Sequence, residues 1–165
     1  MFSTRVCQSL HDEHRATIGL TERIGALLDR CRRSPPDASD PPTQRLLNEI
    51  PAAMDEGVAR HFDFEEAQLF PHLAAAGDSA IGAHLTGEHG VLRPLGAELA
   101  GLARAAATNG FDEHRWQAFR RISVELCNGL VEHVQKEEMV LLPLLDETLD
   151  PDTDARLHAA YNGND

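Results

Sequence analysis

The sequence has few aromatic residues and only three cysteines, and each shortage narrows the class of protein. Aromatic residues make up 5% of the 165 residues, which is low for a β-sandwich, whereas Ala, Leu and Glu, which favour helices, are abundant. The cysteines, Cys7, Cys31 and Cys127, are odd in number and widely spaced. This spacing excludes a disulfide framework and a CxxC redox or metal site, and we expect the thiols to be reduced.

Basic residues are also scarce, with 15 Lys and Arg against 27 Asp and Glu and a formal charge of −12. Such a surface repels phosphate backbones and anionic lipids, so we expect neither nucleic acid nor membrane as a partner. No apolar run approaches the roughly 18 residues of a membrane span, and the first residues lack the apolar segment of a signal peptide. The sequence therefore predicts a cytoplasmic protein with a single domain over residues 1–165, comprising a core at about 4–150 and a polar tail at 151–165.

Apolar residues recur at helical spacing along most of the chain, and proline and glycine mark the connections. We expect helices over residues 4–33, 43–73, 78–108 and 111–150, a loop at 34–42, and a tail that is a short helix or frayed. The alternation of β-branched residues that is typical of strands is not present. Because short loops return each helix beside its predecessor, the predicted fold is all-α, an antiparallel up-down-up-down four-helix bundle.

Two stretches of the sequence share one pattern: residues 61–73 and 133–145 both read H-x-x-x-E-E-x-x-L-[FL]-P-x-L. On a helix that turns about 100° per residue, the His and the first Glu lie within about 40° of each other on one face. A Glu-His pair also occurs in the first helix, at 13–14, and in the third, at 88–89, each with a Leu six residues after the His. The chain thus consists of two similar helical hairpins.

The repeated residues form a candidate metal site once the four helices pack together. They provide four imidazoles and two carboxylates: His14, His61, Glu65, His89, His133 and Glu137. Helix bundles commonly hold two metals with converging side chains, and this donor set suits iron, manganese or zinc, of which we favour iron. With two His per metal, two shared Glu and an oxo or hydroxo bridge, an octahedral metal keeps one position open for a small molecule. The E-x-x-H spacing of ferritin-like sites, the H-E-x-x-H of zinc proteases and the C-x-x-C-H of c-type haem proteins do not occur.

These motifs make the sequence similar to the hemerythrin-like, or HHE cation-binding, proteins over about residues 8–146. The resemblance implies a non-haem di-iron centre in a four-helix bundle, with the six residues above as its ligands. Oxygen-carrying hemerythrins have a fifth His, one turn from another on the third helix, and an Asp five residues after the last His. Here Glu137 follows His133 by four residues, and His84 lies five before His89, about 140° around the helix. The chain is therefore closer to the four-His, two-Glu branch, which includes proteins that repair damaged iron centres and peroxide-handling forms.

We expect a di-iron protein that binds or senses a small diatomic ligand, dioxygen or nitric oxide, because an open metal position is predicted and no substrate-recognition motif is evident. One alternative is an oxidoreductase that handles peroxide or nitric oxide at the same irons, in which case the protein is an enzyme. Another is an iron-centre repair or iron-sensing module. Both alternatives use the same predicted ligands.

Several polar residues near the motifs have open roles. Glu66 and Glu138 lie about 100° around the helix from the predicted ligands, and we expect them to be solvated or to contact the ligands from outside. His11, Gln68 and His72 are weaker candidates for contact with the site. The remaining polar residues near the motifs, Arg93, His84, His114 and His158, are expected at the surface.

Overall fold

The computed structural model describes residues 1–163, and within them the chain is helical with no strand. The first arm is α1 (Arg5–Arg30). The second is an almost continuous run of α2 (Pro41–Ala52), η1 (Ala53–Val58), α3 (Ala59–Phe64), η2 (Glu65–Leu69) and α4 (Phe70–Ala75). The third is α5 (Ala80–Asn109), and the fourth is α6 (Glu113–Lys136), η3 (Glu137–Leu141) and α7 (Leu142–Thr148). A further helix, α8 (Pro151–Tyr161), follows, and the η segments are π-helical turns.

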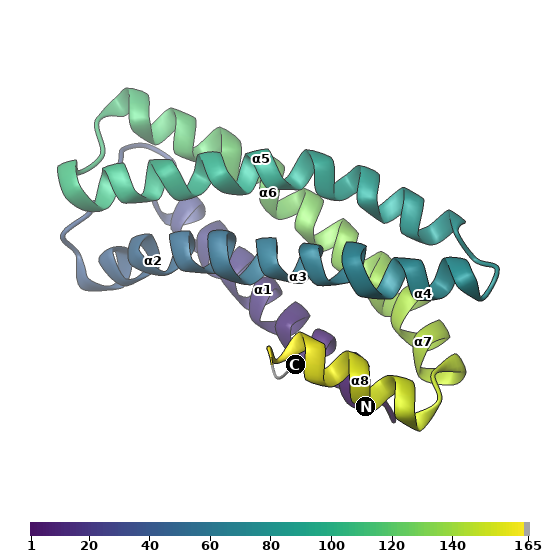
Figure 1. The fold of residues 1–165 in the computed structure, drawn as a ribbon. Helices are drawn as coiled ribbons and strands as arrows, with labels where there is room; N and C mark the ends of the chain where they lie inside the picture. The colour runs from purple at the N-terminus through teal and green to yellow at the C-terminus, as the bar shows by residue number, and fades with distance from the viewer. Residues whose placement is uncertain (164–165) are drawn as a thin grey trace.

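The four arms form the predicted antiparallel bundle (Figure 1). Helix α5 packs against α2 and α6, and α1 packs against α6 and α8. Of the two interpretations of residues 151–165, the short helix is observed as α8, while residues 164–165 lie outside the part that the structure describes. Within the described part, none of the helices is both long and apolar enough to cross a membrane.

The helix boundaries differ from the predicted ones by one to three residues, and the local sequence explains the shift at the start of the second arm. The second arm begins at Pro41 rather than Thr43, because the Asp40 carboxylate caps it and proline is tolerated in the first turn of a helix. The first helix ends at Arg30 rather than at residue 33, and the fourth arm begins at Glu113 rather than at residue 111. These shifts do not move any predicted ligand out of its arm.

The apolar core has two parts, one on each side of the middle of the bundle. The larger part includes Ile24, Leu47, Leu99, Trp116 and Phe119. The smaller part includes Val6, Leu10, Leu85, Leu141, Leu145 and Leu157. The repeated polar motifs lie between the two parts, so the apolar side chains on both sides shield the motifs from water.

The π-helical turns η2 and η3 begin at the Glu of each repeated motif, Glu65 and Glu137. Each turn is followed by the proline of its motif, Pro71 or Pro143, which has no N–H to donate to the carbonyl four residues back. The helical turn before the proline is wider: the Phe70 amide donates to the Glu65 carbonyl, five residues back, and the second motif repeats this bond. Such π-turns frequently mark functional sites.

The first turn of α1 is capped by carboxylates that lie 142 to 149 positions later in the sequence. Asp146 accepts hydrogen bonds of 2.8 Å from the amides of residues 3–4. Asp154, in α8, accepts bonds of 3.1 and 3.0 Å from the amides of residues 5–6, which the start of a helix leaves without intrahelical partners. The yellow helix α8 lies against the purple start of α1 in Figure 1, so the two ends of the described chain are joined.

Candidate metal centre

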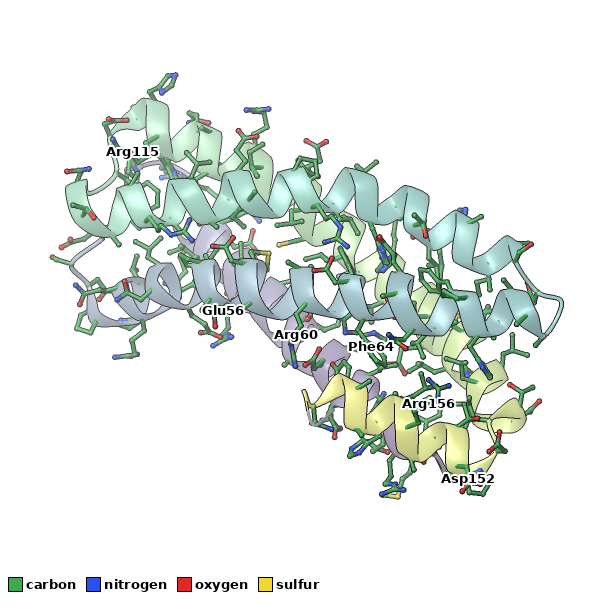
Figure 2. The ribbon with its side chains drawn as sticks, viewed as in Figure 1. Glu56, Arg60, Phe64, Arg115, Asp152 and Arg156 are labelled. Atoms are coloured by element: carbon green, nitrogen blue, oxygen red, sulfur yellow. The ribbon has the colours of Figure 1, made fainter. Side chains whose placement is uncertain are left out.

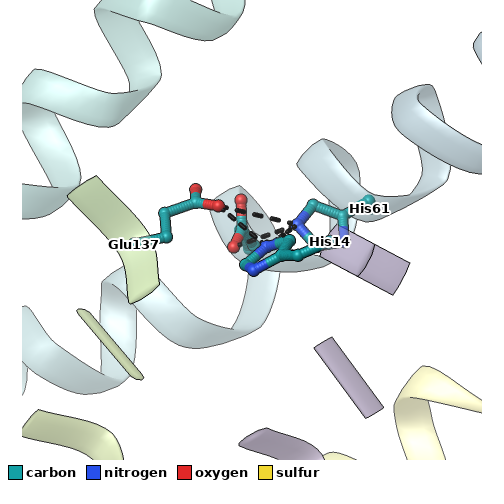
Figure 3. A group of neighbouring side chains, drawn as sticks. His14, His61 and Glu137 are labelled. Carbon is teal, nitrogen blue, oxygen red and sulfur yellow. Dashed lines mark hydrogen bonds and ion pairs between the residues drawn. The ribbon is translucent and has the colours of Figure 1, made fainter. Parts of the chain in front are cut away.

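All six side chains predicted as ligands converge in the middle of the bundle. Each is at most 6% exposed, so the cluster is shielded from solvent. Their ligand atoms form two sets of four, with every atom of a set within 4.8 Å of the others. The first set is His14, His61, Glu65 and Glu137, and the second is Glu65, His89, His133 and Glu137. Figure 3 shows three members of the first set, His14, His61 and Glu137, pointing toward one another.

The two glutamates belong to both sets because each directs one oxygen toward each side. The four distances from a carboxylate oxygen to an imidazole Nε2 are 3.4 Å for Glu65 Oε1 to His61, 3.4 Å for Glu65 Oε2 to His89, 2.9 Å for Glu137 Oε2 to His14 and 2.9 Å for Glu137 Oε1 to His133. A carboxylate that served a single ion would have no need to divide its oxygens in this way. The arrangement therefore suits two neighbouring ions that share both glutamates.

The imidazoles of each set face each other through their Nε2 atoms. The two Nε2 atoms are 3.2 Å apart for His14 and His61, and 3.1 Å apart for His89 and His133. With metal–nitrogen bonds of about 2.1 Å, two nitrogens at right angles on one ion are about 3.0 Å apart. Each imidazole pair thus has the spacing that a single ion needs.

Every imidazole of the cluster donates its Nδ1–H to a glutamate outside the two sets. The bonds run from His14 to Glu138 at 2.6 Å, from His61 to Glu13 at 3.1 Å, from His89 to Glu66 at 2.7 Å and from His133 to Glu88 at 2.8 Å. A carboxylate on Nδ1 fixes the tautomer and leaves the Nε2 lone pair pointing inward, as metal binding requires.

Of the two roles considered for Glu66 and Glu138, contact with the imidazoles is the one observed. Glu13 and Glu88 make the same kind of contact, each accepting a hydrogen bond from an imidazole Nδ1, and this role was not predicted from the sequence. A signal for it was present in the sequence, because a Glu precedes the His of both Glu-His pairs. The sequence did not indicate which histidine each Glu contacts. Glu13 contacts His61 and Glu88 contacts His133, in each case on the other helix of the hairpin and not the adjacent His.

We call the four glutamates that accept from the imidazole Nδ1 atoms the outer glutamates: Glu13, Glu66, Glu88 and Glu138. Basic side chains near the surface pair with each of them. The pairs are Glu13 with Arg60, Glu66 with Arg93, Glu88 with Lys136, and Glu138 with His11. His11 therefore contacts the site through Glu138, and Arg93, expected at the surface, does so through Glu66. Figure 2 shows Arg60 and Phe64 on α3, near α8, where both contact the Tyr161 ring.

The remaining polar candidates lie outside the cluster. His84 has a side chain that is 62% exposed and contacts Glu88 at 3.2 Å, so it supplies no fifth imidazole. Gln68 and His72 are half-buried, and His114 is exposed. Within the described residues, none of these belongs to either ligand set.

The imidazoles and carboxylates of the cluster perturb each other's pKa values. Burial lowers the pKa of His61, but the charge of Glu65 and other nearby carboxylates outweighs burial and raises it well above the ordinary value. The pKa values of His14 and His133 are also raised by neighbouring carboxylates in spite of burial. Burial raises the pKa of Glu137, yet the three imidazoles around it lower that pKa well below its usual range. A cation that binds here competes with protons for the same atoms.

The buried carboxylates fit a metal because their oxygens otherwise have no partner. Within residues 1–163, both oxygens of Glu65 and both of Glu137 are buried and have no hydrogen-bond donor in suitable geometry. An unpaired buried carboxylate is costly, and a cation between these oxygens and the inward Nε2 atoms would remove that cost. Imidazole with carboxylate is a donor set suited to iron, manganese or zinc.

A cavity of about 250 Å³ lies beside the first ligand set, between α1 and η1. Its inner end is formed by His14, His61, His133 and Glu137. Most of its wall is apolar and includes Leu20, Met54, Val58, Phe62, Leu130 and Val134. The cavity gives a small molecule a route to one side of the cluster.

The fold and the cluster together define a helical bundle with a buried imidazole–carboxylate group that could hold metal ions. The family model for the hemerythrin HHE cation binding domain matches residues 6–145, and a second, overlapping match covers residues 84–162. The first match includes all six residues of the cluster, and the chain belongs to this family. No curated protein matches the chain.

Proposed function

We propose that the protein binds two iron ions, one in each ligand set, and that Glu65 and Glu137 are shared between them. The observation that carries this proposal is the division of each carboxylate, with one oxygen toward each imidazole pair. Membership of a cation-binding family and the imidazole–carboxylate donor set support iron. We also propose that residues 1–165 form one domain; the packing of α8 on α1 and its capping of the first turn of α1 support this.

We propose further that the protein binds or senses a small diatomic ligand, dioxygen or nitric oxide, at the first set. His14, His61, Glu65 and Glu137 would hold the iron of this set, and iron bound there would supply the redox chemistry that such ligands require. The chain holds the four Nε2 atoms inward through the outer glutamates and excludes bulk water with the two apolar clusters. The cavity between α1 and η1 leaves the first set accessible.

The second set is more closely covered, which supports the first set as the place of ligand entry. The ring of Phe62 stacks on His89 with centroids 3.8 Å apart and planes 11° apart, and Phe70 lies 5.8 Å from the same imidazole. His89 is completely buried. Both imidazoles of the first set line the cavity, whereas His89 of the second set does not.

The volume of the cavity favours a second candidate function, an oxidoreductase that handles peroxide at the same centre. A water molecule in the liquid occupies about 30 Å³, and a diatomic molecule is of similar size. A cavity of about 250 Å³ is several times larger than such a ligand needs. A larger oxygen compound, such as a peroxide, therefore fits the site as well.

Metal analysis and spectroscopy test both candidates. Protein purified from iron-replete cells is expected to contain about two iron ions per chain. Fewer than about one iron, with another metal in its place, would contradict the di-iron proposal. Spectra recorded with dioxygen, nitric oxide and hydrogen peroxide then separate the functions. A stable adduct that is lost on removal of the gas indicates binding, whereas continuous consumption of the added compound indicates catalysis.

A further inference from the structure

The two halves of the molecule differ in the space beside one helical glycine. Gly57 in η1 and Gly129 in α6 each lie four residues before the histidine of their motif. A Cβ atom on Gly129 would lie 2.7 Å from Cδ2 of Leu92, whereas a Cβ on Gly57 would meet no atom within 4 Å. Leu92 is three residues after the histidine of its Glu-His pair, and the corresponding residue of the first half is Thr17. The first half thus lacks the leucine that occupies this space in the second.

The cavity of about 250 Å³ lies where this leucine is missing, since both Thr17 and Gly57 line it. An apolar cavity of about 150 Å³ in another protein binds benzene, which has six carbon atoms. In proportion, the cavity accepts a molecule of about ten non-hydrogen atoms. Its mouth reaches solvent, because Ala16 and Glu49 at its rim are exposed.

The chemistry of the cavity wall restricts the class of ligand. The middle of the wall is apolar, and the inner end carries His14 and His61 of the first ligand set, His133 of the second and the shared Glu137. The acidic side chains of Glu13, Glu49 and Glu137 line the cavity, and no Lys or Arg is among the described residues that do so. Glu13 and Glu49 pair with Arg60 and Arg23, which do not line the cavity, so the described wall offers no Lys or Arg side chain to bind a carboxylate or phosphate ligand. The wall suits a neutral molecule with an apolar body and an oxygen-containing end.

We propose that this cavity binds a neutral organic hydroperoxide of up to about ten non-hydrogen atoms, with its apolar body against the wall and its oxygen end at His14, His61 and Glu137. The proposal rests on the peroxide-handling function above and names its substrate class. Dioxygen, nitric oxide and hydrogen peroxide have no organic body and leave the apolar wall without contact. Thr17 and Gly57 determine the size of the ligand because they leave the space that Leu92 fills in the second half.

The test introduces into the first half the leucine that the second half has at the corresponding position. The Thr17→Leu variant places a leucine beside Gly57, and the Gly57→Leu variant fills the cavity from the other side, where the added Cβ meets no atom. Gly57→Leu also removes a helical glycine, so it is expected to fold. The matched control is Thr108→Leu, at an exposed threonine of α5 that does not line this cavity. Binding of 2-phenyl-2-propanol, the alcohol of cumene hydroperoxide, is measured by calorimetry on chelator-treated and on iron-loaded protein.

We expect both cavity variants to weaken binding of the alcohol at least about tenfold in either preparation, and the control to leave it unchanged. In iron-loaded protein reduced beforehand under anaerobic conditions, the two iron ions would each give one electron, which with two protons convert the hydroperoxide to its alcohol and water. The ratio of the single-turnover rates with cumene hydroperoxide and hydrogen peroxide should fall at least about tenfold in Thr17→Leu. Binding that changes less than about twofold in both variants, or equally in the control, overturns the proposal. If iron does not bind while the alcohol still does, the di-iron function fails and the hydroperoxide assignment with it. If iron binds and neither readout changes, only the substrate class is wrong.

Discussion

The two halves of this protein carry the same buried histidines and glutamates but differ in what surrounds them. Each half contributes a Glu-His pair, an H-x-x-x-E-E motif and a π-turn that begins at the first Glu of that motif. In the second half, Leu92 contacts the position beside Gly129, and the pocket of about 350 Å³ outside these two residues has none of the six cluster residues in its wall. Two phenylalanines also cover His89. In the first half the corresponding space is a cavity. The repeated residues thus build a nearly symmetric cluster, whereas the residues between them decide which side of the cluster the cavity reaches.

The outer glutamates differ between the halves in a second way. Glu88 is held by Lys136 and His84, which are side chains of its own hairpin. Glu13 is held by Arg60, whose guanidinium also lies 5.1 Å from the centre of the Tyr161 ring and donates to the Tyr161 carbonyl. The first half therefore depends on α8, a helix that has no counterpart in the repeat.

The largest expected effect comes from removing one imidazole from either half. His61→Ala and His133→Ala should each lower the iron content from about two ions to at most about one per chain, because each imidazole belongs to one set. The measurement is metal analysis of the purified variants, with His114→Ala, at an exposed position, as the control. An unchanged content of about two irons in either variant would refute the assignment of that histidine.

Opening the second half should have the next largest effect. Leu92→Thr removes the side chain that fills the space beside Gly129 and buries a hydroxyl, so we expect a loss of about 2–4 kcal/mol in the free energy of unfolding. Urea denaturation measures it, with Val91→Thr, at a neighbouring residue that is 59% exposed, as the control within about 0.5 kcal/mol. A loss below about 1 kcal/mol in Leu92→Thr would mean that the packing of this leucine beside Gly129 does not distinguish the two halves.

Neutralising an outer glutamate should weaken metal binding without removing a ligand. Glu13→Gln and Glu88→Gln keep a hydrogen-bond acceptor for Nδ1 but remove its charge, and each is expected to lower iron affinity about 10- to 100-fold. Competition with a chelator gives the affinity, and Glu125→Gln, at an exposed site on α6, serves as the control. A similar loss of iron affinity in both variants would show that Glu13 and Glu88 contribute equally to metal binding in the two halves. A loss in only one would show that they are not.

The smallest expected effect concerns protons. The folded-state pKa values of His61 and His133 are raised, so their stabilisation is complete below about pH 6.5 and is lost as the pH rises through the folded values. The lowered pKa of Glu137 acts in the opposite direction, and its stabilisation is lost as the pH falls from about 4.3 through the folded value. Chelator-treated protein should therefore be most stable at about pH 5–6 and less stable at about pH 8.

Thermal unfolding across this pH range measures the proton effect and also compares the halves. Because the pKa of each histidine is raised, His61→Gln and His133→Gln should both flatten the pH profile between about pH 6.5 and 8. An unfolding temperature that increases steadily from about pH 5 to pH 8 in chelator-treated protein would contradict this prediction.

The fold and the six converging residues could be predicted because the sequence contains each motif twice, once in each helical hairpin. A motif that occurs once is weak, but its recurrence in a second hairpin fixes both the helix pairing and the inward face. The hydrogen bonds of Glu13 with His61 and of Glu88 with His133 were not predicted. They join two different helices, so the spacing of residues along one helix does not indicate them. The cavity was missed for a related reason: Thr17 is ordinary in the sequence, and its meaning depends on the contact that Leu92 makes with Gly129.

The carboxylates that cap α1 also bear on the order in which the molecule is made. A ribosome synthesises residues 5–30 first, yet the amides at the start of α1 find their acceptors only when Asp146 and Asp154 have been added. His14 likewise waits 124 residues for Glu138, and its set is incomplete without Glu137. Neither half can bring its imidazoles and carboxylates together during early translation, so a nascent chain carries separated histidines and not the assembled cluster. Iron is expected to enter only after the last arm of the bundle has left the ribosome.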